Sequence, residues 1–249
     1  MQTIVETNIY QEMLYKLKKD VNYIKEIPER FQTEEMAMLV IKKDVKLFKY
    51  IKIHTNKVCT EAIKRDGDCL KYIEKPTIGM CKIALIRSPH ALQYVKVQNE
   101  ELCKLAVERN GMTLQHVKKQ TPLLCKLAVT VNPQSLQYVK NQTEEICLMG
   151  VSKRGEVLQH VKEQTEKVCL AAVRQDGMSL RFVKEQTDNI CLEAVKQNGI
   201  ALRHVQKQTD ELCLHAVLSD PISIKYVEVQ TRELSLLAVT INGMALEFV

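Results

Sequence analysis

The chain has 249 residues, of which 45% are apolar and 27% charged, and this composition is typical of a folded, soluble protein rather than a disordered one. It contains no run of about 18 apolar residues, so we predict no membrane-spanning helix. Eight glycines and six prolines supply few turns, which disfavours a β-rich fold. The net charge of +6 permits an acidic partner without requiring one.

The first 30 residues differ from the rest of the chain. Residues 1–20 carry charged side chains and lack the apolar core of a secretory signal, so we expect an intracellular protein that is not secreted. In a reducing compartment the nine cysteines are expected to be free thiols. The apolar positions match the repeat described next only if five residues around Pro28 are skipped. We therefore predict an irregular N-terminal capping unit over residues 1–30.

From residue 31 to residue 249 the sequence repeats every 22 residues. Cysteines make the repeat visible, and a column of small residues and a column of leucines keep the same step. The cysteines of the series are Cys59, Cys81, Cys103, Cys125, Cys147, Cys169, Cys191 and Cys213. The pattern predicts one domain of about eleven stacked units, because a single short hairpin cannot bury its own apolar face.

Residues 165–186 show how the first helix of a unit is encoded. Thr165 is a good N-cap, since its hydroxyl can accept a free backbone N–H. Val168, Cys169, Ala172 and Val173 then share one helical face. We predict a helix of about two turns here, called helix A.

The second helix of each unit begins at a column that holds either glycine or proline. Proline cannot take a positive φ angle, so this column is expected to be the first helical residue and the residue before it the N-cap. Those preceding residues are of capping types, with Arg154 as the exception: Ser88, Asn110, Asn132, Asp176, Asn198, Asp220 and Asn242. In residues 165–186 this second helix, helix B, is predicted to run from about Gly177 to Glu185.

A longer period of 44 residues overlies the first. His116, His160 and His204 alternate with aromatic residues, and prolines recur in alternate units. We predict an all-α, right-handed α-solenoid of 22-residue helix-turn-helix units with a 44-residue higher repeat, which points to duplication of a two-unit block. The chain stops inside the last helix B at Val249, without the polar cap that solenoids usually have. Such an end favours a homo-oligomer formed through the C-terminal repeat.

The string Leu-x-x-Ala-Val-x-x-Asn-Gly-x-x-Leu-x-x-Val recurs along the chain, for example from Leu102 to Val117. Over residues 32–249 the sequence resembles an uncharacterised two-helix tandem-repeat family of amoeba-infecting giant viruses and some bacteria. The resemblance implies an α-solenoid in a viral setting, either the host cytoplasm or the virion. It implies no activity.

The cysteines and histidines do not predict a metal site. Consecutive cysteines lie one repeat apart, about 10 Å for packed helices, which is too far for a disulfide or a shared metal ion, and we interpret them as small buried core residues. His116, His160 and His204 are interpreted as partly buried structural residues. The remaining histidines fall in other columns and are expected to form no cluster: His54, His90 and His215.

Chemistry-bearing motifs are missing from the sequence. It has no nucleophile elbow, phosphate-binding loop, dinucleotide fingerprint or zinc-protease motif. We therefore predict no catalytic residue, no metal and no cofactor.

The best candidate for a binding surface is a ladder of basic and amide side chains on helix B. It has two columns three residues apart, which are expected to share a helix face. The candidate binding face consists of Lys49, Lys52, Lys71, Gln93, Lys96, Gln115, Lys118, Gln137, Lys140, Gln159, Lys162, Arg181, Lys184, Arg203 and Lys225. The glutamine of the recurring Gln-Thr pair is assigned a structural role, as a bridge between neighbouring turns.

Three functions are consistent with this ladder. The first is a non-enzymatic scaffold that binds a partner protein along the face. The second is electrostatic binding of nucleic acid, although few exposed aromatic residues are available to stack on bases. The third is self-assembly through the C-terminal repeat.

Overall fold

The computed structural model describes residues 2–249, with side chains from residue 8 onward. In this part of the chain α-helices alternate with short 3₁₀ helices, and no strand is present. The chain divides into two compact units, Met1–Lys119 and Gln120–Val249. The fold is an all-α repeat solenoid with a period of 22 residues, as the sequence predicts.

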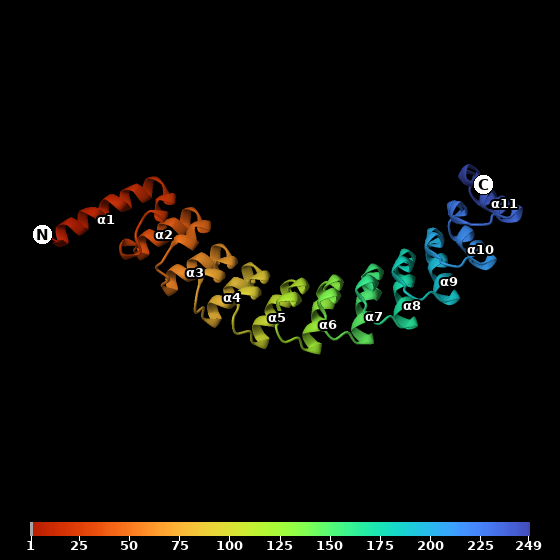
Figure 1. The fold of residues 1–249 in the computed structure, drawn as a ribbon, viewed down its shortest axis with the longest axis horizontal. Helices are drawn as coiled ribbons and strands as arrows, with labels where there is room; N and C mark the ends of the chain where they lie inside the picture. The colour runs from red at the N-terminus through yellow and green to blue at the C-terminus, as the bar shows by residue number, and fades with distance from the viewer. Residues whose placement is uncertain (1) are drawn as a thin grey trace. The chain divides into compact units, whose positions relative to one another are not determined.

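In the first unit, successive α-helices lie side by side in chain order, and the 3₁₀ helices η3 to η6 form a second layer beside α2 to α5 (Figure 1). Its elements are α1 (Gln2–Lys19), η1 (Val21–Lys25), η2 (Glu29–Phe31), α2 (Glu34–Lys43), η3 (Val45–Tyr50), α3 (Asn56–Arg65), η4 (Gly67–Tyr72), α4 (Ile78–Arg87), η5 (Pro89–Tyr94), α5 (Glu100–Arg109) and η6 (Gly111–His116).

The second unit has the same two layers. Its elements are α6 (Pro122–Val131), η7 (Pro133–Tyr138), α7 (Glu144–Lys153), η8 (Gly155–His160), α8 (Glu166–Gln175), η9 (Gly177–Phe182), α9 (Asp188–Gln197), η10 (Gly199–His204), α10 (Asp210–Ser219), η11 (Pro221–Tyr226), α11 (Arg232–Ile241) and η12 (Gly243–Phe248). No helix in residues 2–249 is long and apolar enough to cross a membrane.

The predicted start of each helix is confirmed. Thr165 Oγ1 accepts the N–H of Val168 at 3.4 Å, and Asp176 accepts the N–H of Met178 at 3.0 Å. Proline is the first residue of η5, η7 and η11, and no residue in the described part has a positive φ angle. The Gly/Pro column therefore begins a helix rather than ending one.

Two capping residues depart from the pattern. Arg154, the predicted exception, makes no side-chain capping hydrogen bond. Ser88 makes no side-chain capping hydrogen bond to η5, and its hydroxyl donates to Asp68 Oδ1 at 2.9 Å. The prediction for Ser88 is wrong, and its hydroxyl is directed to a carboxylate of the preceding repeat.

Helix B is shorter and tighter than predicted. In the repeat of residues 165–186 it is the 3₁₀ helix η9, which ends at Phe182, and Val183 is already extended with ψ 123°. The end of the helix is bridged by the residue just before Thr165: Gln164 Nε2 donates to the carbonyl of Phe182 at 2.9 Å, and Gln164 Oε1 accepts the N–H of Lys184 at 2.9 Å. Continuing the helix would require these two backbone groups as hydrogen-bond partners.

The core is aliphatic and runs through each repeat between the two layers. In α8 and η9 the side chains of Val168, Ala172, Val173 and Leu180 are buried. The alanine column is buried as well, with Ala172 at 0% exposure. The last repeat of the second unit is more open, because Leu246 is 66% exposed although its equivalent Leu202 is fully buried.

Candidate binding face

Every residue of the predicted ladder is exposed. The first column is the fifth residue of each 3₁₀ helix from η3 to η11, which we call the fifth-position column. Its members are Lys49, Lys71, Gln93, Gln115, Gln137, Gln159, Arg181, Arg203 and Lys225.

The second column does not share a helix face with the first, and this part of the prediction is wrong. Because each 3₁₀ helix ends one residue after the fifth position, the lysines of the second column lie in the extended link that follows. They are Lys52, Lys96, Lys118, Lys140, Lys162 and Lys184. We call them the link lysines.

Several link lysines make bonds within the fold. In the first unit, Lys96 Nζ donates to the carbonyl of Glu74 at 3.2 Å, and Lys118 Nζ donates to that of Lys96 at 2.6 Å. In the second unit, Lys162 Nζ donates to the carbonyl of Lys140 at 2.6 Å, and Lys184 Nζ to that of Lys162 at 2.8 Å. These ammonium groups tie each link to the preceding one, so their first role is structural.

The glutamine of the Gln-Thr pair does bridge neighbouring turns. Gln142 Nε2 donates to the carbonyl of His160 at 2.9 Å, and its Oε1 accepts the N–H of Lys162 at 2.9 Å. The same pair of bonds recurs at Gln98 in the first unit and at Gln164, Gln186 and Gln208 in the second. We call this series the glutamine column.

Six of the cysteines, those of the 22-residue series from Cys103 to Cys213, face this glutamine column from within the core. All nine are free and buried. Cys191 Sγ lies 3.4 Å from Gln186 Oε1 and Cys213 Sγ lies 3.4 Å from Gln208 Oε1, so each thiol can donate to the amide. Burial raises the pKa of the cysteines, and that of Cys69 reaches about 12. A thiol held protonated is a poor nucleophile and a poor metal ligand.

The histidines of helix B are half-buried, as predicted, but one neighbour was missed. The rings of His90 and His116 meet edge to face with centroids 5.9 Å apart, a contact that the sequence repeat does not predict. His160 Nε2 lies 3.2 Å from Gln134 Oε1 in the equivalent arrangement. Burial, and then the charge of His90, lowers the pKa of His116. In residues 8–249 no three histidine, cysteine or carboxylate side chains come together as a metal site.

Several cations of the fifth-position column lie over the faces of neighbouring aromatic rings. Lys49 Nζ lies 5.0 Å from the ring centroid of Tyr50 in the first unit, and Lys71 Nζ lies 4.9 Å from that of Tyr72. In the second unit the guanidinium of Arg181 lies 4.6 Å from the ring centroid of Phe182. The cations are therefore positioned by aromatic contacts that leave them exposed.

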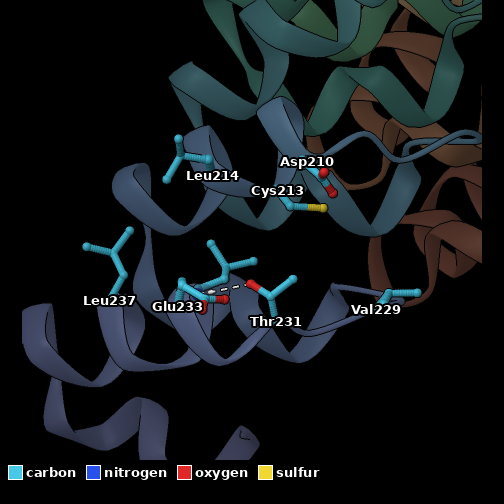
Figure 2. Close-up of a pocket in the computed structure, with 8 residues that line it drawn as sticks. Asp210, Cys213, Leu214, Val229, Thr231, Glu233 and Leu237 are labelled. Atoms are coloured by element: carbon cyan, nitrogen blue, oxygen red, sulfur yellow. Dashed lines mark hydrogen bonds between the residues drawn. The ribbon is translucent and has the colours of Figure 1, made fainter.

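A groove on the opposite, α-helical side of the second unit has a different character. It lies between α10 and α11 and has a volume of 290 Å³. Leucines line it together with Asp210 and Glu233, and Figure 2 shows these two carboxylates beside Leu214 and Leu237. Leu218 and Leu236 are exposed on the same two helices. The sequence repeat does not predict this groove, because the groove depends on the separation between α10 and α11.

Comparison with known proteins gives one match. The family described as "Domain of unknown function (DUF4116)" matches residues 165–209. This segment holds α8, η9, α9 and η10, which is two consecutive repeats and has about the length of the 44-residue block inferred from the sequence. No curated protein and no solved structure matches the chain.

Proposed function

We propose that the chain is a non-enzymatic repeat scaffold that binds a partner protein through its fifth-position column. One observation carries the proposal: in each repeat from η3 to η11 the fifth residue is exposed, although most of the other recurring side chains have a task within the fold. The glutamines bridge turns, the threonines cap helices and the link lysines bond carbonyls. The column makes local contacts, such as the hydrogen bond from Gln137 Nε2 to the carbonyl of Gln134 and the contacts of its cations with rings. It nevertheless stays exposed in every one of these repeats, and such a column is suited to contact with another molecule.

The repeat architecture supports an extended mode of binding. Stacked repeats present equivalent side chains at regular intervals, and solenoids use such rows as binding surfaces. The resemblance to repeats of giant viruses supports an intracellular setting, in the host cytoplasm or the virion.

Binding of nucleic acid is the less favoured alternative. The cations of the fifth-position column would attract phosphates, but the aromatic rings next to them are only half-exposed and carry cations over their faces. Stacking on bases requires open rings. Self-assembly through the exposed C-terminal repeat is a further alternative, and it would appear as an increase in mass with concentration.

The test is a quantitative pull-down from cells with the full chain and two variants. In the first variant the fifth-position cations and glutamines of the second unit are replaced by serine. In the second, an equal number of exposed polar residues on α7 to α10 are replaced. We expect the first variant alone to lose specific partner proteins, and retention of the same partners by both variants would refute the proposal.

A further inference from the structure

The fifth-position column changes chemistry within the second unit. Gln137 and Gln159 are followed by Arg181, Arg203 and Lys225 in three consecutive repeats. All three cations are exposed. We call these three residues the cationic stripe.

Aromatic contacts position the cationic stripe. The guanidinium of Arg203 lies 5.7 Å from the ring centroid of Tyr226, and Lys225 Nζ lies 4.9 Å from the same centroid. Lys225 Nζ is also 5.3 Å from the ring centroid of Phe248. Cations held over rings lose less conformational freedom on binding than free side chains, which favours recognition of a partner anion.

The charge of the stripe is not neutralised within the described residues. Elsewhere in the second unit exposed cations form ion pairs, such as Arg174 with Glu193 and Lys167 with Glu144. In residues 8–249 no carboxylate forms an ion pair with Arg181, Arg203 or Lys225. The positive charges of the stripe also act on the neighbouring His204: burial lowers the pKa of this histidine most, and repulsion by Arg203 and Arg181 lowers it further.

The spacing of the stripe selects the conformation of a ligand. Packed helices lie about 8–10 Å apart, and successive cations of the stripe are one repeat apart. A polyproline II segment rises about 3.1 Å per residue with three residues per turn, so its residues i, i+3 and i+6 lie on one side about 9 Å apart. In a β-strand, side chains alternate between the two faces, so residue i+3 would point away from the stripe while residues i and i+6 faced it.

We propose that the cationic stripe binds an acidic, extended segment of a partner protein with carboxylates at every third residue. This inference rests on the proposed function and names the chemistry of its partner. A polynucleotide fits less well, because it carries a phosphate at every nucleotide and cannot present a single negative charge to each repeat. In addition, cations already lie over the rings of the stripe, which leaves no open ring for a base to stack on.

The experiment measures binding of a labelled 12-residue, proline-rich peptide with glutamates at positions i, i+3 and i+6 to the full chain by fluorescence anisotropy. A second peptide of the same composition has its three glutamates adjacent. The stripe variant is Arg181→Gln, Arg203→Gln and Lys225→Gln, because glutamine occupies this column at Gln137 and Gln159 without disturbing the repeat. The control variant, Lys153→Gln, Lys167→Gln and Lys196→Gln, removes the same charge from α7, α8 and α9.

We expect the spaced peptide to bind the unmodified chain, to bind the stripe variant about tenfold more weakly, and to bind the control variant with little change. The adjacent-glutamate peptide should bind several-fold more weakly than the spaced peptide. Equal losses in both variants, or equal binding of both peptides, would overturn the inference.

Two further outcomes separate this inference from the proposed function. If a 12-nucleotide single strand binds the stripe more tightly than the spaced peptide, the ligand is a nucleic acid and the inference is wrong. If no peptide binds but the pull-down still loses partners when the fifth-position column is changed, the acidic segment is excluded and the scaffold function stands. If the peptide binds through the stripe but no cellular partner depends on the column, the proposed function fails while the chemistry of the stripe holds.

Discussion

The glutamine column distinguishes the two units of the chain. In the second unit every repeat supplies a glutamine at this position, from Gln120 to Gln230. In the first unit Gln32 and Gln98 are separated by His54 and Pro76, which offer no amide. The carbonyl of Tyr72 and the N–H of Glu74 therefore lack the bridge that their equivalents in the second unit have.

The first unit replaces this bridge by a different contact. His54 stacks on Phe48 with ring centroids 5.1 Å apart, and the ring of Phe48 also meets that of Tyr72 edge to face at 6.1 Å. An aromatic stack fixes the position of side chains but does not satisfy backbone hydrogen-bonding groups. The 3₁₀ helices η4 and η5 end after six residues without a glutamine, as the bridged ones do, so the local sequence defines the repeat and the glutamine column reinforces the link that follows each 3₁₀ helix.

The largest effect is expected from removing a bridge in the second unit. Gln164→Leu would leave the carbonyl of Phe182 and the N–H of Lys184 without the amide, at a cost of about 2–4 kcal/mol in the free energy of unfolding. Urea unfolding of the full chain measures this loss. Substitution of the exposed His54 by leucine is the matched change in the first unit and should cost less, and equal losses at both positions would contradict the comparison.

The next effect concerns close approach of the layers. A Cβ atom on Gly177 would lie 2.5 Å from the carbonyl oxygen of Ala194, so Gly177→Ala should destabilise the chain by about 1–3 kcal/mol. Gly79 in α4 has only Thr77 Oγ1 nearby, at 3.9 Å, so Gly79→Ala should stabilise by about 0.5–1 kcal/mol. Thermal unfolding measures both, and a change of the same sign in the two variants would count against the assigned packing.

A bridge can also be restored in the first unit. His54→Gln would supply an amide for the carbonyl of Tyr72 and the N–H of Glu74, and we expect a gain of about 1 kcal/mol. Hydrogen exchange at the Glu74 amide should slow accordingly. Unchanged exchange at Glu74 would show that the glutamine column does not act locally as described.

The smallest effect is the response to acid. The pKa values of His116, His160 and His204 are lowered, mainly by burial, so the folded chain takes up their protons at a lower pH than the unfolded chain does. As the pH falls below about 6.5 the unfolded chain binds more protons, and the free energy of unfolding decreases.

The two units should contribute unequally to this response. Tyrosine is the substitute because it occupies this column at Tyr94 and Tyr138, and a tyrosine side chain does not titrate in this pH range. Replacing both His160 and His204 in the second unit should flatten the pH dependence more than replacing His116 in the first, because two titrating groups are removed instead of one. Urea unfolding at pH 7 and pH 5 compares the variants. A pH dependence that is unchanged in both variants would exclude these histidines as its source.

The sequence predicted most of the repeat, because its signals are local. Thr165 and Asp176 cap helices through contacts within three residues, and the buried face of Val168, Ala172 and Val173 follows from helical spacing. The exposure of the fifth-position column followed from the same spacing.

What the sequence did not predict depends on contacts between turns and repeats. The end of η9 at Phe182 is bridged by Gln164, which lies 18 residues away. His90 and His116 are in contact although they lie 26 residues apart, and an alignment of the 22-residue repeats places them in different columns. Lys184 was predicted to belong to the binding face, but its ammonium group donates to the carbonyl of Lys162, a contact between repeats that helical spacing does not reveal.

The central claim is that the fifth-position column is the surface that meets a partner. Its most direct test is site-specific photo-crosslinking in cells, with a benzophenone side chain placed at position 181 in one variant and at position 174 on α8 in another. We expect a discrete crosslinked partner from position 181 and none from position 174. Equal crosslinking from both positions, or a partner seen only from position 174, would contradict it.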